Sequence, residues 1–279
     1  MRGKLCVITG ATSGVGLAAA QALARKGARL ALIGRDPARG AAALQRIRAT
    51  APGAEVALHY GDLARFAEVK RVADELLQTY PRIDALINNA GALFQRREVT
   101  ADGIERTFAL NHMAYFVMTE RLRERLAASA PARIVSVASR AHEGVTLDFD
   151  DLNMERRYSG WLAYRRSKLA NILWTRELAR RIAGSGVTAN CLHPGFVATR
   201  FGDNNRGWFG LLIGIAKRVS ALRPDQGAET VVHLASAEGL EGTSGDYFAN
   251  SAPATPSVAA QDDTAARRLW DLSEALAQR

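Results

Sequence analysis

The sequence predicts an α/β fold in which a doubly wound parallel β-sheet carries helices on both faces within a single domain. Short, β-rich runs alternate along the chain with longer stretches that place apolar residues at helical spacing. The short runs are apolar throughout, as expected for strands that are covered on both faces. No linker or low-complexity stretch divides the chain, so residues 1–279 are expected to form one domain.

The order of the predicted elements supports this fold, because strand and helix patterns alternate from the first residues to the last. The strands are expected at Leu5–Thr9, Arg29–Ile33, Glu55–His59, Ala85–Asn88, Arg133–Val137, Val187–Leu192 and Gly245–Phe248. The helices are expected at Val15–Arg25, Arg39–Ala49, Phe66–Thr79, Ile104–Ala128, Leu162–Ile182, Gln226–Ser236 and, as an amphipathic C-terminal helix, near Ala265–Leu276. Alternating units of this kind form parallel sheets with right-handed crossovers, and ligands bind beyond the carboxyl ends of the strands.

The composition excludes several classes of protein. Hydrophobic residues make up 48% and charged residues 23% of the chain, which excludes disordered, collagen-like and coiled-coil proteins. Lysine and arginine outnumber aspartate and glutamate by 37 to 28, giving a net charge of +9. Such a charge can indicate a nucleic-acid or membrane partner. The arginines are dispersed in pairs and no DNA-reading motif occurs, so we expect a solvated basic surface and no nucleic-acid partner.

The cysteines and the N-terminus predict a cytoplasmic protein. Cys6 and Cys191 each lie within a short apolar run, which favours buried, reduced thiols in a reducing compartment. The first four residues lead directly into a predicted strand and leave no room for a cleavable signal sequence. The most apolar stretch outside the strands, residues 208–216, is too short for a transmembrane segment.

Two other enzyme classes lack their sequence signals. The histidines at positions 59, 112, 142, 193 and 233 share no metal-ligand spacing, so no metal site is expected. No Gly-x-Ser-x-Gly motif is present, so a serine hydrolase is not expected either.

The turn after the first predicted strand is rich in glycine and reads Thr9-Gly10-Ala11-Thr12-Ser13-Gly14-Val15-Gly16. Glycines allow a sharp turn and bring backbone N–H groups against a pyrophosphate, while the following helix N-terminus favours the anion. An ordinary turn is the alternative, but the position between strand and helix favours a nucleotide site. No Lys-Ser/Thr pair follows, which excludes a Walker loop. The predicted cofactor-binding residues here are Gly10, Thr12, Ser13, Gly14, Val15 and Gly16.

The end of the second predicted strand bears on the choice of dinucleotide. An acidic residue that would bind the ribose of NAD is expected near Asp36, but Asp36-Pro37 is typical of a helix N-cap followed by proline at the first helical position. Gly34 ends the strand, and Arg35 follows it. A small residue followed by arginine leaves room for a 2′-phosphate and supplies a charge for it.

A Tyr-x-x-x-Lys pair, Tyr164 and Lys168, falls near the start of a predicted helix, and residues four apart lie on one helix face. Tyrosine, with a pKa near ~10, is too weak an acid for work at neutral pH unless a neighbouring ammonium lowers that value. Such pairs are common on helix surfaces, so the residues that accompany this one matter. Ser139 ends the fifth predicted strand and can hydrogen-bond a substrate oxygen. Asn111 is a polar residue within a helical pattern, which indicates a helix distortion or a bound water.

Together with the glycine-rich turn and Asn88-Asn89-Ala90-Gly91, these residues resemble the short-chain dehydrogenase/reductase family over nearly the whole chain. The resemblance implies a Rossmann-type fold and a catalytic tetrad of Asn111, Ser139, Tyr164 and Lys168. Tyr164 would transfer the substrate proton, and Lys168 would lower the pKa of Tyr164 and hold the nicotinamide ribose. Ser139 would orient the carbonyl group, and Asn111 would hold a water in a proton relay.

The same resemblance implies further contacts with the cofactor. Asp62 and Leu63 would contact the adenine, although a plain helix cap is an equal alternative for Asp62. The residues that would lie along the adenosine ribose are Asn89, Ala90 and Gly91. Those that would contact the nicotinamide carboxamide are Pro194, Gly195, Val197 and Thr199. In the family, the Gly34-Arg35 arrangement accompanies a preference for NADP(H), with NAD(H) as the alternative.

Several stretches resemble the retinol-dehydrogenase-like branch of the family, including the long segment 140–163. The others are Ser139-Arg-Ala-His142, Lys168-Leu-Ala-Asn-Ile-Leu173, Glu177-Leu-Ala-Arg180, Gly186-Val-Thr188, His193-Pro-Gly195, Gly245-Asp-Tyr-Phe248 and Ala266-Arg-Arg-Leu-Trp270. Residues 196–224 are rich in apolar side chains and are expected to form a substrate lid; a surface helix or a membrane-dipping patch is the alternative.

The expected function is therefore an NADP(H)-dependent oxidoreductase, a carbonyl reductase or alcohol dehydrogenase, that interconverts a hydrophobic ketone or aldehyde and its alcohol. An NAD-dependent alcohol dehydrogenase and a catalytically silent NADP-binding interaction protein are the alternatives. The family often pairs through its two long helices, so the resemblance also implies a homo-oligomer.

Overall fold

The computed structural model describes residues 1–195 and 224–278. In this part of the chain eight strands form one sheet in the order β3-β2-β1-β4-β5-β6-β7-β8. Neighbouring strands are parallel except for the antiparallel pair β7 and β8. The strands span β1 Leu5–Thr9, β2 Arg29–Gly34, β3 Val56–Tyr60, β4 Ala85–Asn88, β5 Ala132–Val137, β6 Val187–Leu192, β7 Tyr247–Ala249 and β8 Ala252–Pro253.

The doubly wound parallel sheet predicted from the sequence is confirmed. Strand order reverses between β1 and β4, which are hydrogen-bonded neighbours with Cys6 opposite Ala85. The carboxyl ends of β1 and β4 therefore border the crevice at which open α/β sheets bind ligands.

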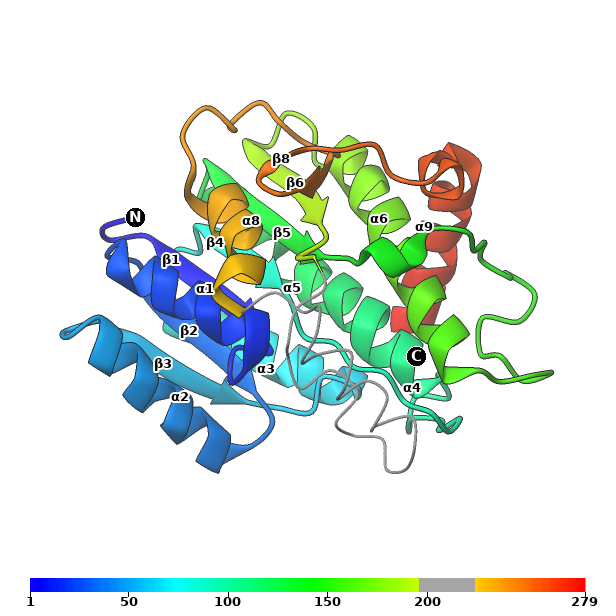
Figure 1. Cartoon of the computed structure of the whole chain (residues 1–279), viewed down its shortest axis with the longest axis horizontal. Coiled ribbons are helices and arrows are strands. Elements are labelled where there is room, and N and C mark those ends of the chain that lie inside the picture. The colour runs from blue at the N-terminus through cyan, green and yellow to red at the C-terminus, as the bar shows by residue number, and fades with distance from the viewer. Residues whose placement is uncertain (196–223, 279) are drawn as a thin grey trace.

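The helices cover both faces of the sheet (Figure 1). They span α1 Gly14–Arg25, α2 Pro37–Thr50, α3 Phe66–Thr79, α4 Arg106–Phe108, α5 Ala114–Ala128, α6 Gly160–Arg181, α8 Pro224–Ser236 and α9 Asp263–Ala277. The alternation of side chains along a strand divides the core. Leu5 and Val7 of β1 pack with α3, α5, α6 and α9, whereas Cys6 and Ile8 pack with α1, α2 and α8.

The predicted helix Ile104–Ala128 is wrong as a single regular helix. α4 leads into η1, a π-helical segment at Ala109–Met113, before α5 begins. The distortion indicated by Asn111 is confirmed, because this residue lies at the centre of η1. Short 3-10 segments also occur at η2, Arg140–His142, and η3, Val258–Gln261.

The structure settles two smaller expectations. Cys6 and Cys191 are both free and buried, as predicted. The last strand pattern, predicted at Gly245–Phe248, instead begins at Tyr247, and the two-residue strand β8 was not predicted. Among the described helices, none combines the length and apolar character needed to cross a lipid bilayer.

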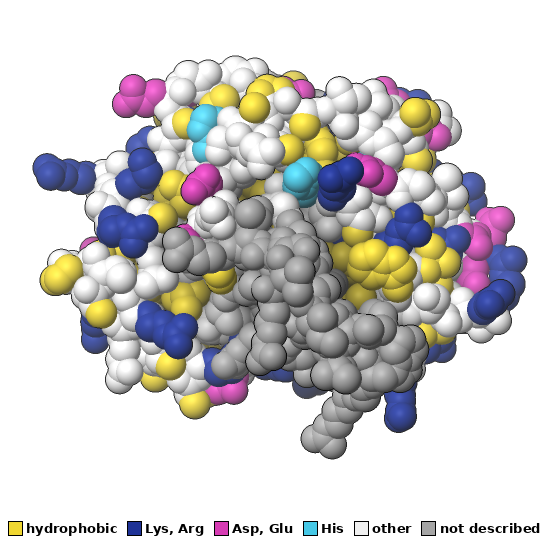
Figure 2. Space-filling model, in the orientation of Figure 1, with side chains coloured by type: hydrophobic (Ala, Val, Ile, Leu, Met, Phe, Trp, Pro, Cys, Tyr) yellow, Lys and Arg dark blue, Asp and Glu magenta, His cyan; other side chains and the backbone are white. Residues whose placement is uncertain are grey.

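Charged side chains are spread over the molecule rather than gathered in one basic patch on the face drawn in Figure 2. Many of the arginines have acidic neighbours. Arg180, for example, forms ion pairs with Glu177 and Asp263 at 2.8 Å in each case.

Candidate active site

The glycine turn, residues 9–16, connects β1 to α1 and packs tightly against the end of β4. Gly10 has a φ of +66°, and a Cβ atom there would lie 2.8 Å from the Cα of Ala90. A Cβ atom at Gly16 would overlap Asn89 Nδ2 and lie 2.6 Å from the carbonyl oxygen of Gly10. Because real Cβ atoms do not approach this closely, both positions require glycine for the turn to keep its shape.

Hydrogen bonds join the two motifs that the sequence analysis assigned to the cofactor. Asn89 Nδ2 donates to the carbonyl oxygens of Thr9 at 2.8 Å and Gly10 at 3.3 Å. The hydroxyl of Thr9 accepts from the main-chain N–H groups of Asn89 at 2.9 Å and Ala90 at 3.0 Å. The ends of β1 and β4 are thus held together at the strand-order reversal.

The second strand end also reaches the glycine turn. Arg35 is exposed after β2. Asp36 caps α2, because its Oδ1 accepts from the N–H groups of Ala38 at 2.9 Å and Arg39 at 3.2 Å. The Asp36 carboxylate therefore serves as the N-cap of α2, as the sequence predicted.

Sequence reasoning missed Arg39, which lies in the first turn of α2. Its Nη2 donates to Ser13 Oγ at 3.0 Å, and its Nε is buried with no hydrogen-bond partner among the described residues. The available signal was its place at the start of a helix that follows the carboxyl end of a strand, where a dinucleotide site is expected.

Asp62 and Leu63 follow β3 beside the same strand ends. The N–H of Gly61 donates to the carbonyl oxygen of Gly34 at 3.0 Å, which joins this segment to β2. Asp62 Oδ1 accepts from the N–H of Ala64 at 3.2 Å, and Leu63 is buried.

Tyr164 and Lys168 lie one turn apart on α6, and both are buried. Lys168 Nζ donates to the carbonyl oxygen of Val137 at 2.7 Å, at the end of β5. The same nitrogen lies 5.8 Å from the centre of the Tyr164 ring and 5.7 Å from that of Tyr115. The spacing of four residues therefore brings the two side chains together, as the sequence predicted.

Ser139 joins this pair from the end of β5. Its side chain is hydrogen-bonded to Tyr164, and this bond lowers the pKa of the phenol. Its main-chain carbonyl accepts from His142 Nδ1 at 2.7 Å, and its Oγ accepts from the N–H of Ala141 at 3.2 Å. The serine is thus held in place by η2 on one side and by the tyrosine on the other.

Asn111 completes the catalytic cluster, the name used below for Asn111, Ser139, Tyr164 and Lys168. Its Nδ2 donates to the carbonyl oxygen of Ala92 and to Ser167 Oγ, both at 2.9 Å, and its Oδ1 accepts from the N–H of Ala92 at 2.9 Å. Gly91 links the cluster to the end of β4, because a Cβ atom there would lie 3.3 Å from Asn111 Oδ1 and 3.5 Å from Lys168 Nζ. Both N–H groups of the Asn111 amide are therefore occupied within the protein. The amide cannot donate to a ligand without breaking its bond with Ala92 or with Ser167.

The electrostatics of the cluster are dominated by burial. Burial raises the pKa of Tyr164 to about 12 and lowers the pKa of Lys168 to about 7. The sequence predicted that the ammonium would lower the pKa of Tyr164; in the protein alone, burial has the largest effect and raises this pKa, and the hydrogen bond with Ser139 is what lowers it. Tyr164 is therefore protonated at neutral pH, while Lys168 is divided between its charged and neutral forms.

Part of the predicted nicotinamide segment is described. Pro194 and Gly195 follow β6; Gly195 has a φ of +77°, and its N–H donates to His193 Nδ1 at 3.1 Å. Val197 and Thr199, and the predicted lid up to residue 223, lie outside the described residues.

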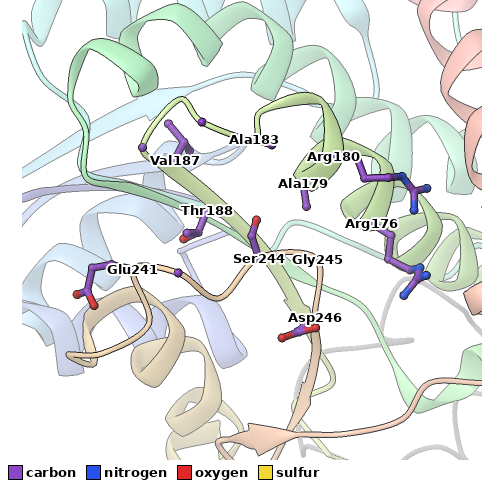
Figure 3. A pocket seen from close by; sticks show the side chains of 13 residues that line it. Arg176, Ala179, Arg180, Ala183, Val187, Thr188, Glu241, Ser244, Gly245 and Asp246 are labelled. Atoms are coloured by element: carbon purple, nitrogen blue, oxygen red, sulfur yellow. The ribbon is translucent and has the colours of Figure 1, made fainter.

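A groove with a volume of about 620 Å³ lies away from the catalytic cluster, at the amino end of β6. Figure 3 shows Arg176 and Arg180 of α6 on one side of it and Glu241 on the other. Both arginines bind Asp263, at 3.1 and 2.8 Å, and Arg180 also binds Glu177 at 2.8 Å, so both guanidinium groups already have acidic partners. In the part of the chain that the structure describes, no group of three or more His, Cys, Asp or Glu side chains is arranged to hold a metal ion.

Comparisons with known proteins agree with this geometry. A family model described as short chain dehydrogenase matches residues 4–208. Retinol dehydrogenase 14 of Homo sapiens is 41% identical, and the match covers 99% of this chain and 87% of that protein.

Solved structures share the fold. An uncharacterized protein from Mycobacterium paratuberculosis superposes with a TM-score of 0.80 at 33% identity, covering 99% of this chain and 94% of its own. A short chain dehydrogenase from Burkholderia cenocepacia, solved in complex with NADP, superposes with a TM-score of 0.71 at 26% identity, covering 94% and 99%.

Proposed function

Because the chain belongs to the short-chain dehydrogenase/reductase family and is retinol-dehydrogenase-like, we propose that it interconverts a hydrophobic ketone or aldehyde and its alcohol with NADP(H). One observation carries the proposal. Tyr164, hydrogen-bonded to Ser139 and one helical turn from Lys168, lies at the carboxyl end of β5, near the crevice bordered by the glycine turn. A proton donor and a dinucleotide cradle are the two parts that a carbonyl reduction of this kind needs.

The residues around the crevice fit NADP(H). Gly10 and Gly16 allow the close-packed shape of the turn, in which main-chain N–H groups can approach a pyrophosphate. Asp36 is committed as an N-cap, so it does not serve as the acid that selects the 2′-hydroxyl of NAD. Arg35 and Arg39 would hold the 2′-phosphate, and Arg39 Nε still has a hydrogen to donate.

When bound, NADP(H) supplies or accepts the hydride. In reduction, the Tyr164 hydroxyl donates its proton to the substrate oxygen, and burial favours this protonated form at neutral pH. Ser139 orients the same oxygen through its hydroxyl. Lys168, in its charged form, stabilises the phenolate that Tyr164 becomes, and Asn111 holds the segment around Ala92 against α6.

The hydrophobic substrate is supported by the relatives, whose names refer to retinol, an apolar alcohol. The apolar residues predicted to form a lid argue in the same direction. The cytoplasmic location and the homo-oligomer stay predictions.

The proposal is tested by measuring NADPH oxidation by the purified protein with a panel of hydrophobic aldehydes and ketones. We expect turnover with NADPH to exceed that with NADH. Tyr164→Phe should lower kcat by about 10³-fold while the Kd for NADPH stays within about twofold. Turnover by Tyr164→Phe equal to wild type would overturn the mechanism, and tight NADPH binding without wild-type turnover would favour the catalytically silent alternative.

A further inference from the structure

Trp161 stacks on the proposed proton donor. It lies in the first turn of α6, three residues before Tyr164, and this spacing places both side chains on one helix face. The two rings are nearly parallel, with centroids 5.8 Å apart and an interplanar angle of 19°. The indole therefore lies directly beside the group that would meet the substrate oxygen.

The indole is unusual in its exposure. Trp161 is 46% exposed, whereas Trp174 and Trp270, the other tryptophans in the described part of the chain, are 0% and 1% exposed. The other large hydrophobic residues that are exposed among the described residues are Val99 and Val258. A large aromatic ring that remains open beside a buried tyrosine offers a contact surface for a ligand at that tyrosine.

Close packing fixes the position of this surface. Gly160 lies against the segment after β4, because a Cβ atom there would lie 2.9 Å from the Cα of Gln95 and overlap the carbonyl oxygen of Phe94. Ser159 Oγ accepts from the N–H of Leu162 at 3.4 Å and caps the helix. These contacts hold the backbone of the first turn of α6 before and after Trp161, and the indole therefore starts from a fixed position.

We infer that Trp161 is a specificity-determining residue that contacts the group bonded to the substrate carbonyl and favours a flat aryl or conjugated group there. The inference rests on the proposed function, since Tyr164 marks the position of the carbonyl oxygen only if it is the proton donor. A flat π-system can lie against the open part of the indole in an offset stack, whereas a puckered saturated ring of the same size cannot.

A matched pair of substrates tests the inference: 2-naphthaldehyde and its fully saturated decalin analogue, each reduced with NADPH. Trp161→Ala should raise the KM for 2-naphthaldehyde by about fivefold to tenfold with little change in kcat, and should change the KM for the decalin aldehyde by less than about twofold. Trp161→Phe should keep most of the preference. Val99→Ala, which removes exposed apolar surface that does not stack on Tyr164, is the control and should behave as wild type.

Two results would overturn the inference. One is an equal effect of Trp161→Ala on both substrates; the other is a fall in kcat with a shifted pH profile and unchanged KM, which would mean that the indole only shields Tyr164. Calorimetric titration of the two aldehydes into the protein saturated with NADP⁺, which has no hydride to give them, separates this question from turnover. Wild-type preference for 2-naphthaldehyde that is lost in Trp161→Ala supports the inference even if no substrate turns over, a result that would count against the proposed function alone. Equal binding of both aldehydes by wild type would count against the role of Trp161.

Discussion

The glycine turn and the catalytic cluster are neighbours built by different physical means. In the glycine turn, main-chain atoms approach one another so closely that no Cβ atom fits at Gly10 or Gly16. In the catalytic cluster, buried polar side chains are held by hydrogen bonds; Asn111 alone takes part in three, donating two and accepting one. The glycine turn therefore cannot accept added atoms, whereas the catalytic cluster cannot lose hydrogen-bonding groups.

The largest effect is expected where an atom is added to the glycine turn. Gly16→Ala places a methyl group on Asn89 Nδ2 and the carbonyl oxygen of Gly10, so the turn must open where a pyrophosphate would bind. We expect the Kd for NADPH, measured by fluorescence titration, to rise by roughly 1,000-fold. Gly242→Ala is the matched control, because a Cβ atom at Gly242 meets nothing within 4 Å. Equal affinity in the two variants would show that close packing does not govern this region.

The complementary change removes hydrogen bonds from the catalytic cluster. Asn111→Ala removes three hydrogen bonds, those with the N–H and the carbonyl oxygen of Ala92 and with the hydroxyl of Ser167, and we expect the free energy of unfolding to fall by about 3 kcal/mol. Asn88→Ala is the comparison: Asn88 Nδ2 donates only to Thr119 Oγ1, at 3.0 Å, and Asn88 Oδ1 has no partner among the described residues. Its expected cost is about 1 kcal/mol. Urea denaturation measures the free energy of unfolding of both variants. A larger decrease in Asn88→Ala than in Asn111→Ala would contradict the argument from hydrogen bonds.

Much of the fold and part of the site could be predicted because their causes are local. β1 and β4 were predicted with the correct bounds since their residues are apolar on both faces of the sheet. Asp36-Pro37 marked the start of α2 because capping involves only adjacent residues. The pairing of Tyr164 with Lys168 follows from helix periodicity alone.

The rest depends on residues that are distant in the sequence. Asn111, at the centre of η1, is hydrogen-bonded to Ala92 and Ser167. These partners are distant in the sequence, so no local pattern predicts the bounds of η1. The contact between Arg39 and Ser13 joins segments 26 positions apart. The pKa of Tyr164 depends on how deeply α6 packs, which residue spacing does not reveal. Spacing predicted the ammonium as the main influence on this pKa, whereas burial has the largest effect.

The two regions also differ in how their stability depends on pH, since the glycine turn contains no titrating side chain and the catalytic cluster does. Burial lowers the pKa of Lys168 from its ordinary value of 10.5 to about 7. Between these values the unfolded chain binds a proton that the folded protein has lost, so this residue makes stability rise with pH above about 7. Lys168→Met should remove that contribution. We expect wild type to gain about 1.5 kcal/mol relative to the variant between pH 7 and pH 8.5, measured by urea denaturation. A constant difference across that range would mean that Lys168 keeps its charge when buried.

The smallest effect is expected at Arg39, a side chain outside the glycine turn that holds it through a hydrogen bond. Arg39 Nη2 binds Ser13 Oγ at 3.0 Å, so its loss removes one hydrogen bond and one charge near the proposed 2′-phosphate position. Arg39→Ala should lower kcat/KM for NADPH by about tenfold and leave that for NADH within about twofold. Arg46→Ala is the control, because Arg46 lies on α2 two turns further from the glycine turn. If Arg39→Ala weakens both cofactors equally, Arg39 only holds Ser13 in place, and the glycine turn depends on side-chain support in the same way as the catalytic cluster.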